Sequence, residues 1–306
     1  MSSVLYDTPG PRAKRRNLLY SVVFLLLLAL LLWWVWGVLS DKGQLDWVKW
    51  SPFFTQSLSW TTYLLPGLGN TLKAAALSMV IALPLGAFFG IARLSDHRWV
   101  RVPAAVVVEF FRAIPVLLLM VFANQLYSES TDISSDSRPL YAVVTGLVLY
   151  NASVLAEVVR AGILALPKGQ TEAAQAIGLR KGQTMVSILL PQAVTTMLPA
   201  IVSQLVVIVK DTALGGAILG FPELLDARKT LAANYANVIP SFIIVALVFI
   251  VLNLLLTTLA SWLEGRLRRS KRSTGAVLGA DAVTELNAVG EAQDALPRPP
   301  RTGKVP

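Results

Sequence analysis

Cysteine is absent from this sequence of 306 residues, and histidine occurs once, at His97. Without cysteine the chain can form neither a disulfide nor a thiolate metal site, although this absence identifies no compartment. A single histidine, set among charged residues, leaves no His-based metal set and no Ser-His-Asp catalytic set. The phosphate-binding pattern G-x-x-x-x-G-K-[ST] is missing as well. The sequence therefore predicts a chain that is not an enzyme and that holds no metal or cofactor of its own.

Charge is also scarce. Only 15% of the residues are charged, against roughly 25% in an average soluble protein, and 55% are hydrophobic, with a mean hydropathy of +0.61. These values predict a membrane protein. The net charge of +9 does not indicate nucleic-acid binding, because the basic residues are scattered over several loops rather than gathered on one face. We interpret them as topological signals that also attract anionic lipid.

Long apolar runs dominate the sequence. About 20 apolar residues in a helix span a hydrocarbon core, where only intrahelical bonds satisfy the backbone. Six segments meet this requirement: Leu18–Leu39, Ala74–Ala92, Val102–Tyr127, Pro139–Ala156, Met185–Val209 and Val238–Leu263. The segment Val102–Tyr127 qualifies only if the pair Glu109 and Arg112 is tolerated. We therefore predict an all-α, polytopic membrane protein with six transmembrane helices.

The first apolar run invites a second interpretation, because a basic cluster precedes it as in a signal peptide. Its length exceeds the h-region of about 7–15 residues that a signal peptide carries, and no small-x-small cleavage site follows. We therefore predict a segment 1–17 in the cytoplasm and a retained helix at 18–39. The distribution of Lys and Arg places both termini in the cytoplasm. Residues 270–306, poor in apolar periodicity, are predicted to form a disordered cytoplasmic tail.

The loop 166–191 contains the phrase KGQT twice, at Lys168–Thr171 and Lys181–Thr184. In the first copy we expect Gly169 to turn the chain and Thr171 to cap a helix over residues 172–177, which Gly178 ends in a left-handed conformation. The second copy is interpreted as a turn back to the membrane. Two helical turns are unstable alone, and their alanines offer a smooth surface for another protein. The alternative is a plain reversal, which needs only about two to eight residues.

Within this loop, Glu172-Ala173-Ala174, three residues, Gly178, nine residues and Ile188-x-Leu190-Pro191 resemble the EAA signature of the inner-membrane permeases of ABC importers. Further strings resemble the polar amino-acid subfamily: Gly69 to Leu72, Glu109 to Pro115, Ala156 to Ile163, Gly169-Gln170, Leu190 to Ala193, and Lys210 to Thr212. The pattern is most similar to actinobacterial glutamate importer permeases. It departs from many relatives in the apolar run Val116 to Met120, which lacks their glutamine.

The resemblance implies a five-helix type I importer core over residues 62–265, with 18–39 as an added helix and 166–191 as the coupling loop. It assigns contact with the ATPase to Gly169, Gln170, Glu172, Ala173, Ala174 and Gly178. The implied partners are a cytoplasmic ATPase that uses ATP-Mg, a second permease (a copy or a paralogue) and an extracellular or periplasmic amino-acid-binding protein. The implied location is the bacterial plasma membrane. Kinks at Pro84, Pro115, Pro191 and Pro199 would serve alternating access.

Polar residues within the spans are the candidates for binding an amino-acid zwitterion: Asn124, Asn151, Ser153, Gln204, Lys210, Asp211 and Thr212. The last three combine donors for a carboxylate with acceptors for an ammonium group. The alternative is that Lys210 and Asp211 cap the fifth span. Asn151 and Ser153 are interpreted rather as helix–helix hydrogen-bonding groups.

Two pairs of opposite charge recur at the i, i+3 spacing, Glu109 with Arg112 and Glu157 with Arg160. Residues at this spacing share a helix face and can neutralise each other. We predict that both are structural ion pairs rather than substrate contacts. A second functional reading is kept beside the importer: an ion-coupled secondary transporter or channel subunit in which the EAA match arose by chance.

Overall fold

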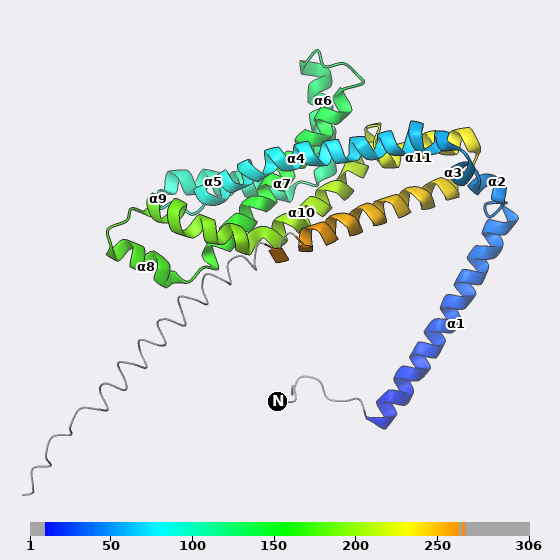
Figure 1. The fold of residues 1–306 in the computed structure, drawn as a ribbon, viewed down its shortest axis with the longest axis horizontal. Coiled ribbons are helices and arrows are strands. Elements are labelled where there is room, and N and C mark those ends of the chain that lie inside the picture. Colours follow the sequence, from blue (N-terminus) through cyan, green and yellow to red (C-terminus); the bar gives the residue numbers. More distant parts are fainter. Residues whose placement is uncertain (1–9, 263–264, 267–306) are drawn as a thin grey trace, which may run out of the picture. The chain divides into compact units, whose positions relative to one another are not determined.

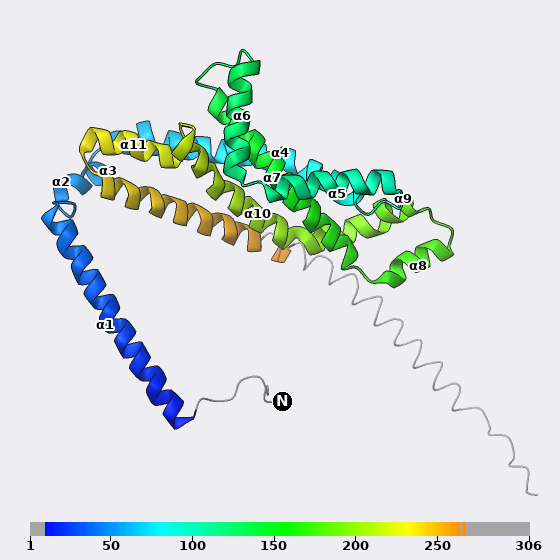
Figure 2. The ribbon, with the colours of Figure 1, turned by 180° about the vertical axis from the view of Figure 1, so that it is seen from behind.

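The computed structural model of the protein describes residues 10–262 and 265–266, and all regular structure within this part of the chain is helical (Figures 1 and 2). The elements in order are α1 (Pro11–Asp41), α2 (Trp47–Trp50), α3 (Pro52–Thr55), the π-helix η1 (Ser59–Leu64), α4 (Leu65–Ala92), α5 (Arg98–Ala113), α6 (Val116–Ser130), α7 (Arg138–Leu164), α8 (Lys168–Ala176), α9 (Lys181–Thr184), the π-helix η2 (Met185–Leu189), α10 (Leu190–Ile218) and α11 (Leu224–Tyr235), followed by a helix at Val238–Trp262. The predicted tail 270–306 lies outside the described residues.

Within the described residues, five helical stretches are long and apolar enough to cross a membrane. They are Pro11–Asp41, Ser59–Ala92, Arg138–Leu164, Lys181–Ile218 and Val238–Trp262. Each contains one of the predicted apolar runs, apart from Leu263, which lies outside the described residues. The all-helical, multi-pass prediction is therefore confirmed.

The sixth predicted span is not one straight helix. α5 and α6 bend by 98° at the break between Ala113 and Val116. Ile114 and Pro115 at this break have extended backbone, with ψ values of 129° and 130°. The proline ring disfavours the helical conformation for the residue before it, and α5 ends at this position. The predicted run 102–127 thus corresponds to a pair of helices broken at the predicted kink of Pro115, which counts as a sixth span if the pair crosses the membrane together, whereas Pro84 and Pro199 lie inside α4 and α10.

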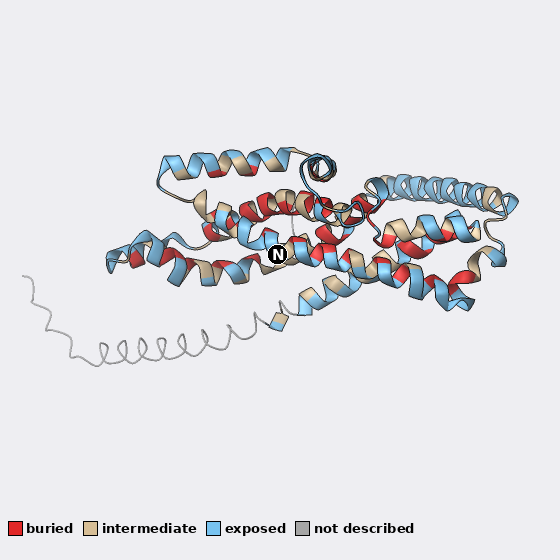
Figure 3. Ribbon diagram, turned by 90° about the horizontal axis from the view of Figure 1, so that it is seen from above, coloured by how far each residue is buried: buried red, intermediate tan, exposed pale blue. Residues whose placement is uncertain are grey.

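The chain divides into two compact units, one formed by Met1–Thr71 with Pro222–Val248 and the other by Leu72–Phe221 with Phe249–Pro306. In the first unit, α1 contains no buried residue and is almost wholly blue in Figure 3. The short helices of this unit are tied by side chains to backbone oxygens. Trp60 Nε1 donates to the Phe53 oxygen at 2.8 Å, and Asn237 Nδ2 donates to the Lys49 oxygen at 3.0 Å.

In the second unit the most buried helix is α7, which crosses α4 and α10 in both ribbon views (Figures 1 and 2). Small residues let the neighbouring helices approach it. A Cβ atom on Gly86 of α4 would lie 2.9 Å from the Ala152 oxygen of α7, and one on Gly146 of α7 would lie 2.7 Å from the Met120 nitrogen of α6. Packing through such small residues is typical of helices in membranes, where burial of apolar surface does not drive association.

Candidate functional site

The loop that follows α7 forms the short helix α8, Lys168–Ala176, as the sequence predicted, but the helix begins earlier than expected. Pro167 occupies the position before the first turn, and Lys168 and Gly169 are already helical. Thr171 is therefore not the N-cap, and Gly169 does not turn the chain. Pro167 is compatible with this start, because the first N–H groups of a helix have no intrahelical partner and the N–H that proline lacks is not needed there.

The end of α8 agrees with the prediction. Gly178 has φ +84°, a conformation that favours glycine. Its N–H donates to the Gln175 oxygen at 3.0 Å, and the N–H of Leu179 donates to the Ala174 oxygen at 3.0 Å. These two bonds form the Schellman motif, which satisfies carbonyl groups left free at a helix end.

One face of α8 is held and the other is open. Ala174 is buried, and Gln170 Nε2 donates to Gln192 Oε1 of α10 at 2.9 Å. Glu172 and Ala173 are exposed, and Ile177 just beyond the helix exposes 78% of its surface. The helix is thus positioned from one side and presents an acidic and apolar face on the other.

The second KGQT is also helical. It forms α9, which continues through η2 into α10, and Arg180 N–H donates to Gln183 Oε1 at 2.9 Å at its start. The interpretation of this copy as a turn was wrong, because the side chain of Gln183 bonds back to the residue before the first turn and so initiates a helix.

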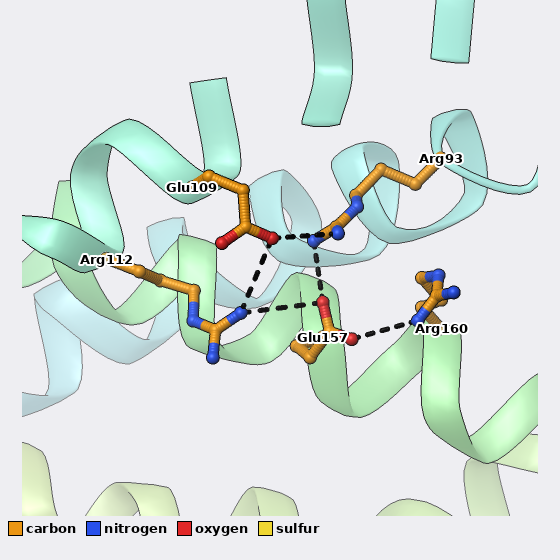
Figure 4. A network of polar contacts seen from close by, with 5 residues as sticks. All are labelled: Arg93, Glu109, Arg112, Glu157 and Arg160. Atoms are coloured by element: carbon orange, nitrogen blue, oxygen red, sulfur yellow. Dashed lines mark hydrogen bonds and ion pairs between the residues drawn. The ribbon is translucent and has the colours of Figure 1, made fainter. Parts of the chain in front are cut away.

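The two predicted ion pairs join into one cluster near the ends of α4, α5 and α7 (Figure 4). Arg160 bonds Glu157 at 3.0 Å as predicted, whereas Arg112 lies 3.8 Å from Glu109 and 3.6 Å from Glu157. The strongest contacts come from Arg93, whose guanidinium lies 3.0 Å from Glu109 and 2.6 Å from Glu157. Sequence spacing could not predict that Arg93 contacts these carboxylates, because Arg93 follows α4 whereas Glu109 and Glu157 lie in α5 and α7.

Asn151 and Gln204 are the two substrate candidates that the structure brings together. Gln204 Nε2 of α10 donates to Asn151 Oδ1 of α7, and Asn151 Nδ2 donates to the Leu147 oxygen at 2.7 Å. Asn151 is fully buried. This is the helix–helix hydrogen bonding expected of Asn151, whereas Ser153 Oγ donates to the Leu149 oxygen of its own helix.

Lys210, Asp211 and Thr212 lie inside α10, which continues to Ile218. They therefore do not cap its end, and the capping alternative was wrong. Lys210 is exposed and lines a cavity of about 370 Å³ together with Ser203 and, from the last helix, Thr257 and Ser261. Thr212 is buried and donates to the Val209 oxygen at 2.8 Å. Asn124 is half-buried on α6, apart from this cavity lining.

A buried carboxyl group, which the sequence did not predict, directly precedes α11, outside the membrane-spanning helices. Glu223 is fully buried and accepts from the N–H groups of Leu225 and Asp226, each at 2.8 Å. Thr71 Oγ1 donates to it at 3.3 Å, and burial raises its pKa to about 7. The signal in the sequence was Glu223 three residues before Asp226 of the first turn, in the position of a helix N-cap.

The described fold is that of an all-helical, multi-pass membrane protein with a short exposed helix between two of its spans. Residues 82–269 match the family of binding-protein-dependent transport system inner membrane components. The chain belongs to this family, and it is a permease subunit of the ABC transporter class.

Individual proteins similar to this chain are also subunits of amino-acid transporters. The chain is 49% identical over 234 residues to the glutamate transport system permease protein GluD of Corynebacterium glutamicum, covering 76% of this chain and 85% of that protein. It is 31% identical to the arginine transport system permease protein ArtQ of Bacillus subtilis, covering 70% of this chain and 97% of that protein. A crystal structure of an amino acid ABC transporter with histidines matches 70% of this chain and 98% of its own, with a TM-score of 0.63 and 27% identity.

Proposed function

We propose that the protein is the permease subunit of an ATP-driven importer of polar amino acids and that its substrate is glutamate. The observation that carries the proposal is the 49% identity to a glutamate transport permease over 76% of the chain. The exposed face of α8, ended by Gly178, supports a coupling role for the helix. The alternative of an ion-coupled secondary transporter gains no support from these relatives.

In this proposal residues 62–265 form the importer core and 166–191 its coupling loop, with both termini and α8 in the cytoplasm. Gly169, Gln170, Glu172, Ala173, Ala174 and Gly178 belong to the helix or its C-terminal end, and Glu172 and Ala173 form the exposed face toward an ATPase that hydrolyses ATP-Mg. A second permease, a copy or a paralogue, completes the pathway, and an external amino-acid-binding protein delivers the substrate. The substrate passes polar groups of the second unit, among them Lys210 at its cavity and the bonded pair Asn151 and Gln204.

Co-purification with the ATPase tests the coupling role. Glu172→Lys reverses a charge on the exposed face of α8, and Gly178→Trp places a bulky side chain at a position with φ +84°. Both variants should lose the ATPase, whereas Glu129→Lys, an equal charge reversal on α6, should retain it. Retention of the ATPase by both α8 variants would refute the coupling role.

Uptake measurements test the substrate and the energy source. Deletion of the gene should abolish uptake of radiolabelled glutamate, and the intact transporter in proteoliposomes should require ATP inside and the binding protein outside. Unchanged glutamate uptake in the deletion strain would reject glutamate as the substrate. Transport that followed an ion gradient without ATP would reject the importer class altogether.

A further inference from the structure

The segment between α4 and α5, residues 93–97, contacts the chain on both sides of α8. On the entry side, Arg93 bonds Glu157 of α7 at 2.6 Å, seven residues before α7 ends at Leu164. On the exit side, Lys181, the first residue of α9, donates to the Leu94 oxygen at 3.0 Å and forms an ion pair with Asp96. Residues 93–97 therefore contact both the helix that precedes the α8 loop, α7, and the helix that follows it, α9.

The two contacts differ in strength. The Arg93 side chain is only 11% exposed, and Glu157 also receives Arg160 and Arg112. In contrast, Lys181 and Asp96 are 49% and 75% exposed, so solvent screens their attraction. Hydrogen bonding from Lys181, aided by its charge, lowers the pKa of Asp96. The contact of Arg93 with Glu157 is thus firm, whereas the contact of Lys181 with Asp96 can break at a small cost in free energy.

A cavity lies directly beside the contact of Lys181 with Asp96, so α9 has room to move there. This cavity of about 500 Å³ adjoins the end of α4, α9 and the start of η2, and it is lined by Phe88, Ile91, Leu94, Ser95, Gly182 and Met185 together with both members of the ion pair. Side chains that border a void lack partner atoms on that side, so they oppose displacement weakly. The π-helix η2 begins at Met185, and such segments occur frequently at functional sites.

We propose that Lys181 and Asp96 form a releasable latch that positions α9 against the α4–α5 segment and carries displacement of α8 to α4 and α5. The latch adds a polar contact to the apolar packing of Ile91 and Leu94 against the cluster that contains Met185. The proposal rests on the coupling role proposed for α8 and adds a route by which that role acts. Lys181 and Asp96 are positioning residues in this scheme, since neither touches substrate or nucleotide.

Charge exchange tests the latch in the whole transporter, reconstituted with its ATPase and binding protein. Asp96→Lys and Lys181→Asp each place like charges together, and we expect each to lower the amount of glutamate carried per ATP hydrolysed at least threefold. The double exchange restores the pair and should restore the ratio to within twofold of the wild type. The melting temperature and ATPase co-purification should not change in any of the three variants, because the pair is exposed.

The outcomes separate this proposal from the one on which it rests. If the wild-type chain binds no ATPase, the importer assignment fails before the latch is tested. If the single variants carry as much glutamate per ATP as the wild type, or if the double exchange does not restore the ratio, the latch is refuted. Loss of the ATPase from the single variants would also refute it, because the pair would then serve docking.

A crosslink tests whether the two sides separate during transport. The sequence has no cysteine, so Ser95→Cys with Gly182→Cys introduces a unique pair in this chain, on opposite walls of the cavity and beside an intact latch. A short reducible bis-thiosulfonate reagent should stop transport, and dithiothreitol should restore it. Each single cysteine variant treated with the same reagent is the control. Unchanged transport by the crosslinked double variant would show that the walls do not separate, and would overturn the releasable latch.

Discussion

Arg93 and Glu157 are 64 positions apart in the sequence, yet their side chains meet at 2.6 Å (Figure 4). Arg93 also bonds Glu109 at 3.0 Å, so one guanidinium joins the carboxylates of two other helices. The side chain of Arg93 is 11% exposed, whereas that of Arg112 is 39% exposed. Within this cluster, Arg93 is the residue that connects the end of α4 to both α5 and α7.

Replacing Arg93 with methionine should therefore lower stability more than replacing Arg112. Arg93→Met removes both close contacts and leaves Glu157 with weaker compensation, which should reduce the free energy of unfolding by about 1–3 kcal/mol. Arg112→Met removes only contacts longer than 3.5 Å in an exposed setting, and the expected loss is below about 1 kcal/mol. Thermal unfolding in detergent measures both, and equal losses would contradict the central position of Arg93.

The sequence predicts features that depend on neighbouring residues better than features that depend on contacts between distant segments. The five long spans follow from apolar length, since lipid leaves the backbone no alternative to a helix. The end of α8 at Gly178 follows from local chemistry, because a left-handed residue favours glycine. The kink at Pro115 follows from the same kind of rule, since a residue that precedes a proline, here Ile114, favours extended backbone, but its angle of 98° depends on tertiary packing.

The candidate site was less predictable, because its contacts join distant segments. The spacing of Glu109 and Arg112 gave a pair on one helix, but tertiary packing gave Glu109 a closer partner in Arg93. The contact of Lys181 with Asp96 has no signature in either segment. Likewise, Glu223 is buried where Asn70 and Thr71, which are distant in the sequence, bond the Pro222 oxygen and the Glu223 carboxylate.

The hydrogen bond between Asn151 and Gln204 should couple their contributions to stability. In a double-mutant cycle with Asn151→Leu and Gln204→Leu, the coupling energy should be about 0.5–2 kcal/mol, the range observed for side chains bonded between membrane helices. Ser153→Ala with Gln204→Leu is the matched control, since Ser153 bonds its own helix. Additive effects in the Asn151 cycle would show that the bond contributes nothing measurable.

Two glycines of the coupling loop should respond in opposite ways to alanine. Gly178 has φ +84°, so Gly178→Ala should destabilise the end of α8 by about 1 kcal/mol. Gly169 lies inside α8 with open space around it, so Gly169→Ala should stabilise the helix by about 0.5–1 kcal/mol. Hydrogen exchange of the α8 amides measures both changes. Slower exchange in Gly178→Ala would contradict the left-handed cap.

The carboxyl group of Glu223 should make stability depend on pH. Its pKa is raised from 4.5 to about 7, first by burial and further by the neighbouring charge of Asp226, whereas the hydrogen bonds from Leu225, Asp226 and Thr71 act in the opposite direction. Between these two pKa values the folded state holds a proton that the unfolded chain has released. Stability therefore falls as the pH rises from about 4.5 to about 7, and this contribution changes little above that range.

Glu223→Gln should remove this dependence, because the amide resembles the protonated carboxyl group in shape and charge. We expect the apparent melting temperature of the wild type in detergent to decrease between about pH 5 and pH 7.5, and that of Glu223→Gln to decrease less over the same interval. Glu129→Gln, at an exposed position of α6, is the control and should follow the wild type. Parallel profiles for Glu223→Gln and the wild type would mean that Glu223 has the same proton affinity in the folded and unfolded chain. The hydrogen bonds that Glu223 accepts from Leu225, Asp226 and Thr71 would then offset the effect of burial on its pKa.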